Sequence, residues 1–112
     1  MKISEENWGS FVILDIDGQL NAITCNELEK RLNTLIDQGE KQFLLNFTGL
    51  DYISSAGLRV LLVAAKKLKA GNGKIVLASL KGQVRKVFDA AGFSALFHMF
   101  DTCEEAMQNF RS

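Results

Sequence analysis

Runs of apolar residues alternate along this chain with stretches in which apolar side chains recur every three or four positions. The apolar runs predict β-strands over residues 11–16, 42–47 and 74–78, with a shorter strand around 96–100. The first of these strands is expected to form a hairpin with the residues before Asn7, across the turn-like segment "NWGS".

Apolar residues at helical spacing follow each of the four predicted strands, so a helix is expected after every strand. The first helix is expected to end at Gly39, the second at the "GNG" segment and the third at Gly92, and a fourth begins near Thr102. The apolar positions that define the helix faces are Leu28, Leu32, Leu35 and Ile36, then Leu58, Leu61, Leu62, Ala65 and Leu68, then Val84, Val87, Phe88 and Ala91.

Strand and helix therefore alternate four times, which is typical of an α/β domain. We expect a single domain spanning residues 1–112, with a mostly parallel or mixed sheet of about four to five strands flanked by about four helices. Right-handed crossovers bring the strand-to-helix loops to one edge of the sheet, where partners of such folds usually bind. Two loops stand out at this edge, residues 17–22 and 48–55.

Composition and charge narrow the class of protein. Thirteen basic residues balance thirteen acidic ones, so no overall field attracts nucleic acid or an anionic membrane. The central apolar run "VLLVAA" is too short to span a bilayer, and the first ten residues lack the apolar segment of a signal peptide. We therefore expect a cytoplasmic protein without a membrane span. Lys66, Lys67 and Lys69 are interpreted as a solvated face near the end of the second helix.

The two cysteines and the single histidine offer little for metal binding or catalysis. Cys25, Cys103 and His98 form no metal-binding spacing, so no metal or cofactor is expected. Each cysteine follows a threonine, in "TCNE" and "TCEE", which predicts capping boxes from Thr24 to Glu27 and from Thr102 to Glu105. A thiol of lowered pKa that senses redox state is the alternative; small residues tolerated in two first turns are the favoured interpretation.

The segment "SSAGL" opens the second helix with more small residues than capping needs. Either Ser54 or Ser55 suffices as the cap. Gly57 in place of alanine costs about 1 kcal/mol, which indicates a close approach of either backbone or a partner at this position. Ser54, Ser55, Ala56 and Gly57 all have small side chains. The start of this helix is therefore predicted to be a flat surface that another protein can reach.

Catalytic motifs that use serine or phosphate do not match this segment. GxSxG and GxxxxGK[ST] are both absent, and "GNGK" precedes a strand instead of a helix. A small serine hydrolase stays a third hypothesis, and it would require a base beside Ser55 that the sequence does not supply.

Two segments of the chain together resemble the STAS domain of bacterial anti-sigma factor antagonists. They are "LLNFTGLDYISSAGLRVLLVAAKKLKAGNGKIVLASLKGQVRKVFDAAGF" and "DGQLNAITCNELEKRL". The resemblance covers nearly the whole chain. It implies a regulator without enzymatic activity. Unphosphorylated, such a protein binds an anti-sigma factor that is also a serine kinase and so frees the sigma factor. Phosphorylation by that kinase releases the protein, and a serine phosphatase restores it.

Carried over to this sequence, the resemblance makes Ser55 the phosphate acceptor. It also implies a partner-binding surface that comprises Asn21, Ser54, Ala56, Gly57 and Arg59. Ser54, Asn46 and Asn21 stand where the family often has acidic residues, and we expect this difference to bear on the choice of kinase. The alternative within the same fold is a scaffold or transport-complex STAS subunit without phosphorylation.

Overall fold

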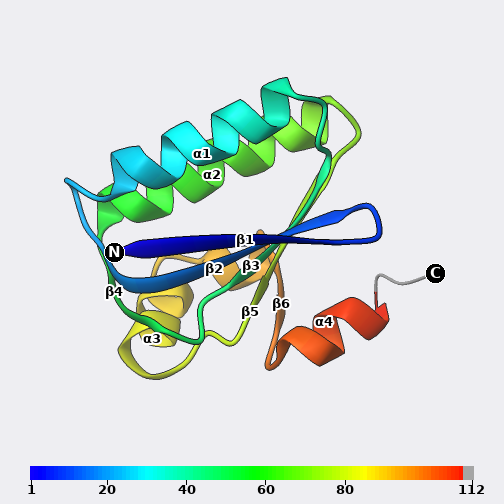
Figure 1. Cartoon of the computed structure of the whole chain (residues 1–112). Coiled ribbons are helices and arrows are strands. Elements are labelled where there is room, and N and C mark those ends of the chain that lie inside the picture. The colour runs from blue at the N-terminus through cyan, green and yellow to red at the C-terminus, as the bar shows by residue number, and fades with distance from the viewer. Residues whose placement is uncertain (110–112) are drawn as a thin grey trace.

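Strands and helices build a mixed sheet with helices on both of its faces (Figure 1). The structure is a computed structural model that describes residues 1–109, so residues 110–112 of the expected domain lie outside it. The elements in order are β1 (Lys2–Trp8), β2 (Phe11–Leu20), α1 (Cys25–Asp37), β3 (Gln42–Asn46), β4 (Leu50–Ile53), α2 (Ser55–Ala70), β5 (Lys74–Ala78), α3 (Gly82–Ala90), the 3-10 turn η1 (Phe93–Ala95), β6 (His98–Phe100) and α4 (Cys103–Asn109). The expected α/β alternation and the N-terminal hairpin are confirmed.

The sheet has the order β1-β2-β3-β5-β6, and β4 pairs with the far end of β2. Among the described strands, β1 alone runs antiparallel to its neighbour, as a tight hairpin allows, while the other pairs are parallel. The pairing of β2 with both β3 and β4 places the ends of β2 and β4 side by side, where Leu20 faces Ile53.

Alternation along β2 separates two apolar layers. Val12, Leu14 and Ile16 belong to the larger core beneath α1 and α2, while Phe11 and Ile13 belong to a smaller cluster that Ala106 of α4 covers. Figure 1 shows α1 and α2 lying together over one face and α4 against the other. α3 joins the larger core through Val84 and Phe88, whose ring lies 6.2 Å from that of Phe47 and 5.7 Å from that of Phe93.

The loop expected over residues 48–55 is wrong in part, because residues 50–53 form β4. Along β4 the first and last residues are buried and the middle two are exposed. Neither an alternating pattern nor an apolar run therefore marks this strand in the sequence. The loop expected over residues 17–22 is also shorter than expected, because β2 continues to Leu20 in order to pair with β4. Gly18 has φ +101° at a register shift and its N–H donates to the carbonyl of Gly49 at 2.8 Å. This bulge redirects β2 from β3 to β4.

Capping of α1 differs from the expected box between Thr24 and Glu27. Thr24 already has helical backbone angles, and its hydroxyl makes no capping bond to the helix. Asn21 caps instead, because its side-chain oxygen accepts from the backbone N–H of Ile23 and of Thr24, both at 2.9 Å. The Thr24 hydroxyl in turn accepts from the N–H of Asn21 at 2.8 Å, which completes a reciprocal box one turn earlier.

At α4 the hydroxyl half of the expected box is confirmed. The hydroxyl of Thr102 accepts from the backbone N–H of Glu105 at 3.1 Å.

Candidate functional site at the start of helix α2

Ser54 joins β4 to α2 and fixes where the helix begins. Its backbone N–H donates to the carbonyl of Leu20 at 2.9 Å, which ties it to the end of β2. Its backbone is extended, its hydroxyl accepts from the N–H of Gly57 at 3.3 Å, and its carbonyl accepts from Leu58 at 3.0 Å. Ser54 is therefore the N-cap of α2, as expected of one of the two serines.

Ser55 is the first residue of α2 and its side chain is exposed. Among residues 1–109 no partner accepts from or donates to its hydroxyl. The first turn of α2 contains no acidic residue. A negative charge placed on Ser55 would therefore meet the positive end of the helix dipole without a repelling carboxylate in the same turn.

Gly57 is buried, and its reason for being glycine lies inside the protein. A Cβ atom there would lie 2.9 Å from Cγ of Leu20 and 3.0 Å from Cγ1 of Ile53. The helix start thus sits directly on the side chains at the ends of β2 and β4. Of the two explanations for Gly57, a close approach within the fold accounts for it. Because Gly57 is buried, it would support a partner surface indirectly, by allowing α2 to pack closely on Leu20 and Ile53.

The remaining expected site residues lie around the same edge. Asn21 follows directly on Leu20, whose carbonyl accepts from Ser54, so the loop after β2 and the start of α2 are adjacent. Asn21 and Ala56 are half-buried, and Arg59 is exposed one turn into α2.

Sequence reasoning missed Ile23, which is 81% exposed in the loop after β2. The only signal for it was an isoleucine that fits neither the strand pattern before it nor the helix pattern after it.

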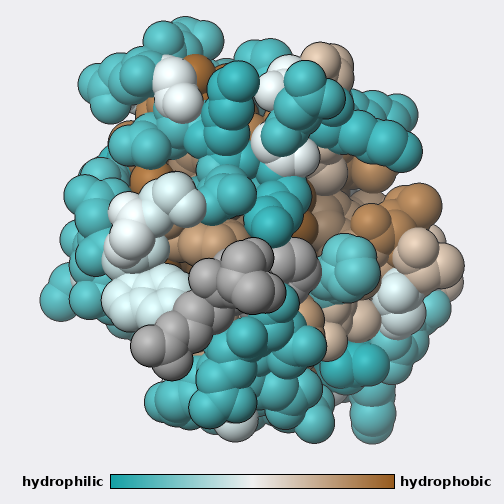
Figure 2. All heavy atoms as spheres, turned by 90° about the vertical axis from the view of Figure 1, so that its right-hand side faces the viewer, coloured by the Kyte–Doolittle hydropathy of each residue, from teal (hydrophilic) through white to brown (hydrophobic). Residues whose placement is uncertain are grey.

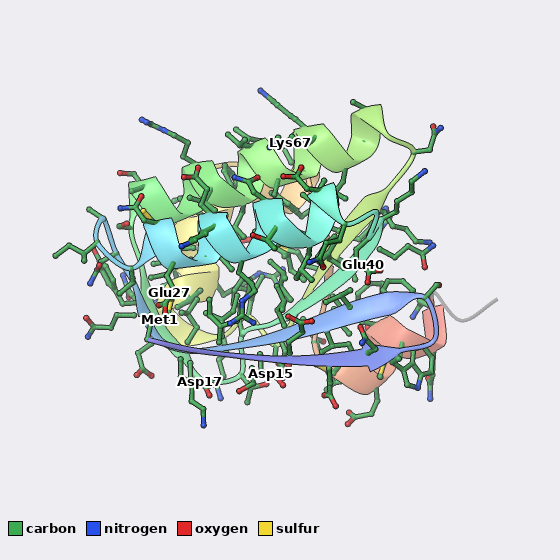
Figure 3. All side chains as sticks on the ribbon, turned by 45° about the horizontal axis from the view of Figure 1, so that its top comes forward. Met1, Asp15, Asp17, Glu27, Glu40 and Lys67 are labelled. Carbon is green, nitrogen blue, oxygen red and sulfur yellow. The ribbon has the colours of Figure 1, made fainter. Side chains whose placement is uncertain are left out.

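Asn46 lies at a different point of the same sheet edge, between β2 and β5. Its side-chain nitrogen donates to a carboxylate oxygen of Asp15 at 2.6 Å, and its oxygen accepts from the N–H and hydroxyl of Thr48. Figure 3 shows Asp15 and Asp17 projecting from the same side of β2. An amide at position 46 can donate to this carboxylate, whereas an aspartate there would place two negative charges in contact. The local contacts therefore account for asparagine at this position.

The two cysteines lie in different surroundings. Cys25 is buried, and its sulfur donates to the carbonyl of Ala22 at 3.4 Å. Burial, together with the nearby carboxylates of Asp15 and Glu104, raises the pKa of Cys103 to about 11. The redox-sensing alternative, which required a lowered thiol pKa, is wrong for Cys103.

A serine hydrolase also finds no support around Ser55. His98, the chain's single histidine, lies on β6, which is separated from β2 by β3 and β5. Within residues 1–109, no group of three histidine, cysteine, aspartate or glutamate side chains is arranged to hold a metal ion. None of the helices that the structure describes has the length and apolar character to cross a membrane.

The candidate site is therefore a capped helix start that presents an exposed serine at one edge of an α/β sheet. The chain belongs to the STAS domain family, whose model matches residues 2–106. It is 38% identical over 112 residues to BtrV of Bordetella bronchiseptica, described as an anti-sigma factor antagonist, and covers 97% of that protein.

Solved structures show the same fold. One is a Thermotoga maritima protein described as an anti-sigma factor antagonist, at TM-score 0.93, 22% identity and coverage of 98% of this chain and 95% of that one. Another is the anti-sigma factor antagonist SpoIIAA in its unphosphorylated form, at TM-score 0.80, 26% identity and 99% of each chain. SpoIIAA of Bacillus in its phosphorylated form matches at TM-score 0.77, 25% identity, 96% of this chain and 98% of that one. Anti-sigma factor antagonists are regulators and not enzymes, in agreement with the non-enzymatic interpretation.

Proposed function

We propose that this protein is an anti-sigma factor antagonist controlled by phosphorylation of Ser55. Unphosphorylated, it binds an anti-sigma factor that is also a serine kinase; once phosphorylated, it is released, and a serine phosphatase returns it to the binding form. The observation that carries the proposal is the position of Ser55, exposed directly after the capping serine at the start of α2. Support also comes from the 38% identity to BtrV and from a relative, SpoIIAA, that exists in both phosphorylation states.

The electrostatics of the helix start explain how one phosphate can switch binding without disturbing the fold. Phosphoserine adds about −1.5 to −2 charges at neutral pH. This charge suits the positive end of α2, so the domain itself tolerates it. A partner docked over the same helix start would instead have to accommodate a bulky, hydrated dianion. Losing about 3 kcal/mol of binding weakens association more than a hundredfold, enough to release a micromolar partner.

The proposed partner surface combines two adjacent segments. The start of α2 contributes Ser54, Ala56 and Arg59, held in place by Gly57 beneath them, and the loop after β2 contributes Asn21. We add Ile23, because an isoleucine 81% exposed beside this edge provides apolar area that a partner can bury. Binding through such a surface needs neither nucleic acid nor a cofactor, and a cytoplasmic location fits partners that control transcription.

The deciding experiment is phosphorylation in an extract of the source cell supplied with ATP, followed by mass spectrometry of the modified residue. Phosphate is expected on Ser55, with Ser55→Ala unmodified and permanently bound to the kinase. Phosphate on Ser54 in the Ser55→Ala variant, with normal release, would mean that the wrong serine has been assigned. Modification of neither serine would favour the scaffold or transport-complex alternative.

A further inference from the structure

A groove lies along α2 on the side of η1 and β6. Two adjoining hollows of about 220 and 300 Å³ share Ala65, Lys69, Leu96 and Phe97, so they form one surface. We call it the α2–β6 groove; its first part also includes Leu62 and Lys66. Figure 2 shows apolar surface at the right of the face in view, on the β6 side of the sheet, with hydrophilic side chains above and below it.

The floor of the groove is apolar, and part of it is unusually exposed. Leu96, which directly follows η1, is 62% exposed, beside the half-buried Leu62 and Ala65. Isolated apolar residues on a surface need no explanation, but here the exposed leucine continues an apolar hollow. Covering this leucine removes apolar surface from water, so an occupant of the groove would gain free energy.

The rim of the groove is basic although the whole chain is electrically balanced. Lys66, Lys69 and Lys74 line the two hollows, and no aspartate or glutamate does. Within residues 1–109 neither Lys66 nor Lys69 forms an ion pair. Lys67, between them in sequence, points to the other side of α2, where its ammonium donates to Asn33 of α1 at 2.9 Å. Figure 3 labels Lys67 on this side. Lys74 lines the second hollow, but its ammonium lies 5.7 Å from the centre of the ring of Phe11, which belongs to the smaller apolar cluster on the other face of the sheet. The positive charge at the rim therefore comes from Lys66 and Lys69.

We propose that the α2–β6 groove docks an amphipathic helix of a partner protein that carries acidic residues beside its apolar face. A hollow apolar floor receives side chains spaced at i, i+3 or i+4 and i+7. Lys66 and Lys69, three residues apart on one face of α2, can then pair with carboxylates along the flank of that helix. A membrane surface fits less well, because interfacial binding uses a continuous apolar face that enters the lipid, and here the apolar residues line a hollow between α2 and the segment around Leu96.

This surface is separate from the phosphorylation edge and does not depend on it. Lys66 follows Ser55 by eleven positions along one helix, which corresponds to about 16 Å. A helix bound in the α2–β6 groove therefore leaves the start of α2 open, and its affinity should be the same for the unmodified chain and for Ser55→Asp.

The test is a titration of the isotope-labelled full chain with two synthetic amphipathic peptides, followed by NMR. Both peptides have leucine at the apolar positions; one has glutamate beside them and the other lysine. The acidic peptide is expected to shift the amide signals of residues 62–69 and 96–98 and to bind about tenfold or more tightly than the basic one. Reversing both charges, Lys66→Glu with Lys69→Glu, should invert this preference, and Leu96→Ser should weaken both peptides.

Two matched controls separate the groove from general surface effects. Lys67→Glu changes a neighbouring lysine on the far side, and Val63→Ser removes an exposed apolar side chain of α2 outside the groove. Neither should alter peptide affinity, and thermal unfolding checks that every variant is folded. Equal affinity for the two peptides, shifts elsewhere on the molecule, or no inversion after the charge reversal would overturn the proposal. Groove-dependent sedimentation with phosphatidylglycerol vesicles, without peptide binding, would overturn it in favour of a lipid surface.

Discussion

At the scale of single residues, the two serines at the start of α2 have different structural roles. The hydroxyl of Ser54 accepts the N–H of Gly57, while that of Ser55 faces solvent. Ser54→Ala should therefore lower the free energy of unfolding by about 1 kcal/mol, as lost caps do, and Ser55→Ala should leave it nearly unchanged. Thermal unfolding followed by circular dichroism measures both. Equal losses in the two variants would contradict the assignment of Ser54 as the cap.

Cys103 offers a second residue-scale test through its pH dependence. Since its pKa is raised to about 11, the thiolate that reacts with iodoacetamide is scarce at pH 8. The rate of alkylation at Cys103 should therefore rise about tenfold per pH unit between pH 8 and 10. Mass spectrometry locates the adduct, and Cys103→Ser provides the blank. A rate that is already at its plateau near pH 8 would show an activated thiol and restore the redox alternative.

At the scale of elements, the contact between α2 and the ends of β2 and β4 depends on Gly57. Alanine normally stabilises a helix interior by about 1 kcal/mol relative to glycine. In Gly57→Ala the added methyl meets Leu20 and Ile53 at about 3 Å, and overpacking of this kind costs about 1–3 kcal/mol. We therefore expect a net loss of stability in thermal unfolding. Gly71→Ala, where the nearest atom lies 3.8 Å away, is the matched control and should be neutral or stabilising.

The loop between β2 and α1 combines a structural residue with an exposed one. Asn21 caps α1, so Asn21→Trp should lower the melting temperature in addition to changing the surface of this loop. Ile23 makes no such capping contact through its exposed side chain. Ile23→Asp should keep the melting temperature and weaken binding to the anti-sigma factor kinase about tenfold or more. Unchanged affinity, measured by calorimetry, would remove this loop from the partner surface.

At the scale of the whole molecule, the proposed switch changes binding and leaves the fold intact. A carboxylate at the start of a helix adds about 0.3–1 kcal/mol of stability, so Ser55→Asp should unfold at the same temperature or slightly higher. The same variant should bind the kinase more weakly than the unmodified chain, although a single carboxylate mimics a phosphate dianion incompletely. Unfolding and affinity are measured on one preparation. A loss of stability alongside the loss of binding would indicate a disturbed fold instead of a switch.

Local patterns determined most of the architecture and the position of the serine pair. Apolar runs, helical spacing and glycine stops depend on neighbours in sequence, and they predicted the hairpin, α1 to α4 and the exposed start of α2. β4 escaped prediction because its alternation is broken and it forms only through pairing with β2. Thr24 and Glu27 match the spacing of a capping box, whereas the box that forms pairs Asn21 with Thr24, after β2 has shifted its register at Gly18.

What only the tertiary structure decided is which groups come into contact across the chain. The sequence marks Gly57 as unusual, but only the packed fold shows that Leu20 and Ile53 occupy the space of its missing methyl. The raised pKa of Cys103 likewise depends on burial and on Asp15 of β2, far away along the chain. Hydrophobic periodicity records which face of an element is buried, because that depends on the element itself. Close contacts, desolvation and the meeting of Leu96 with α2 depend on how separate elements pack, so they become visible only in the folded molecule.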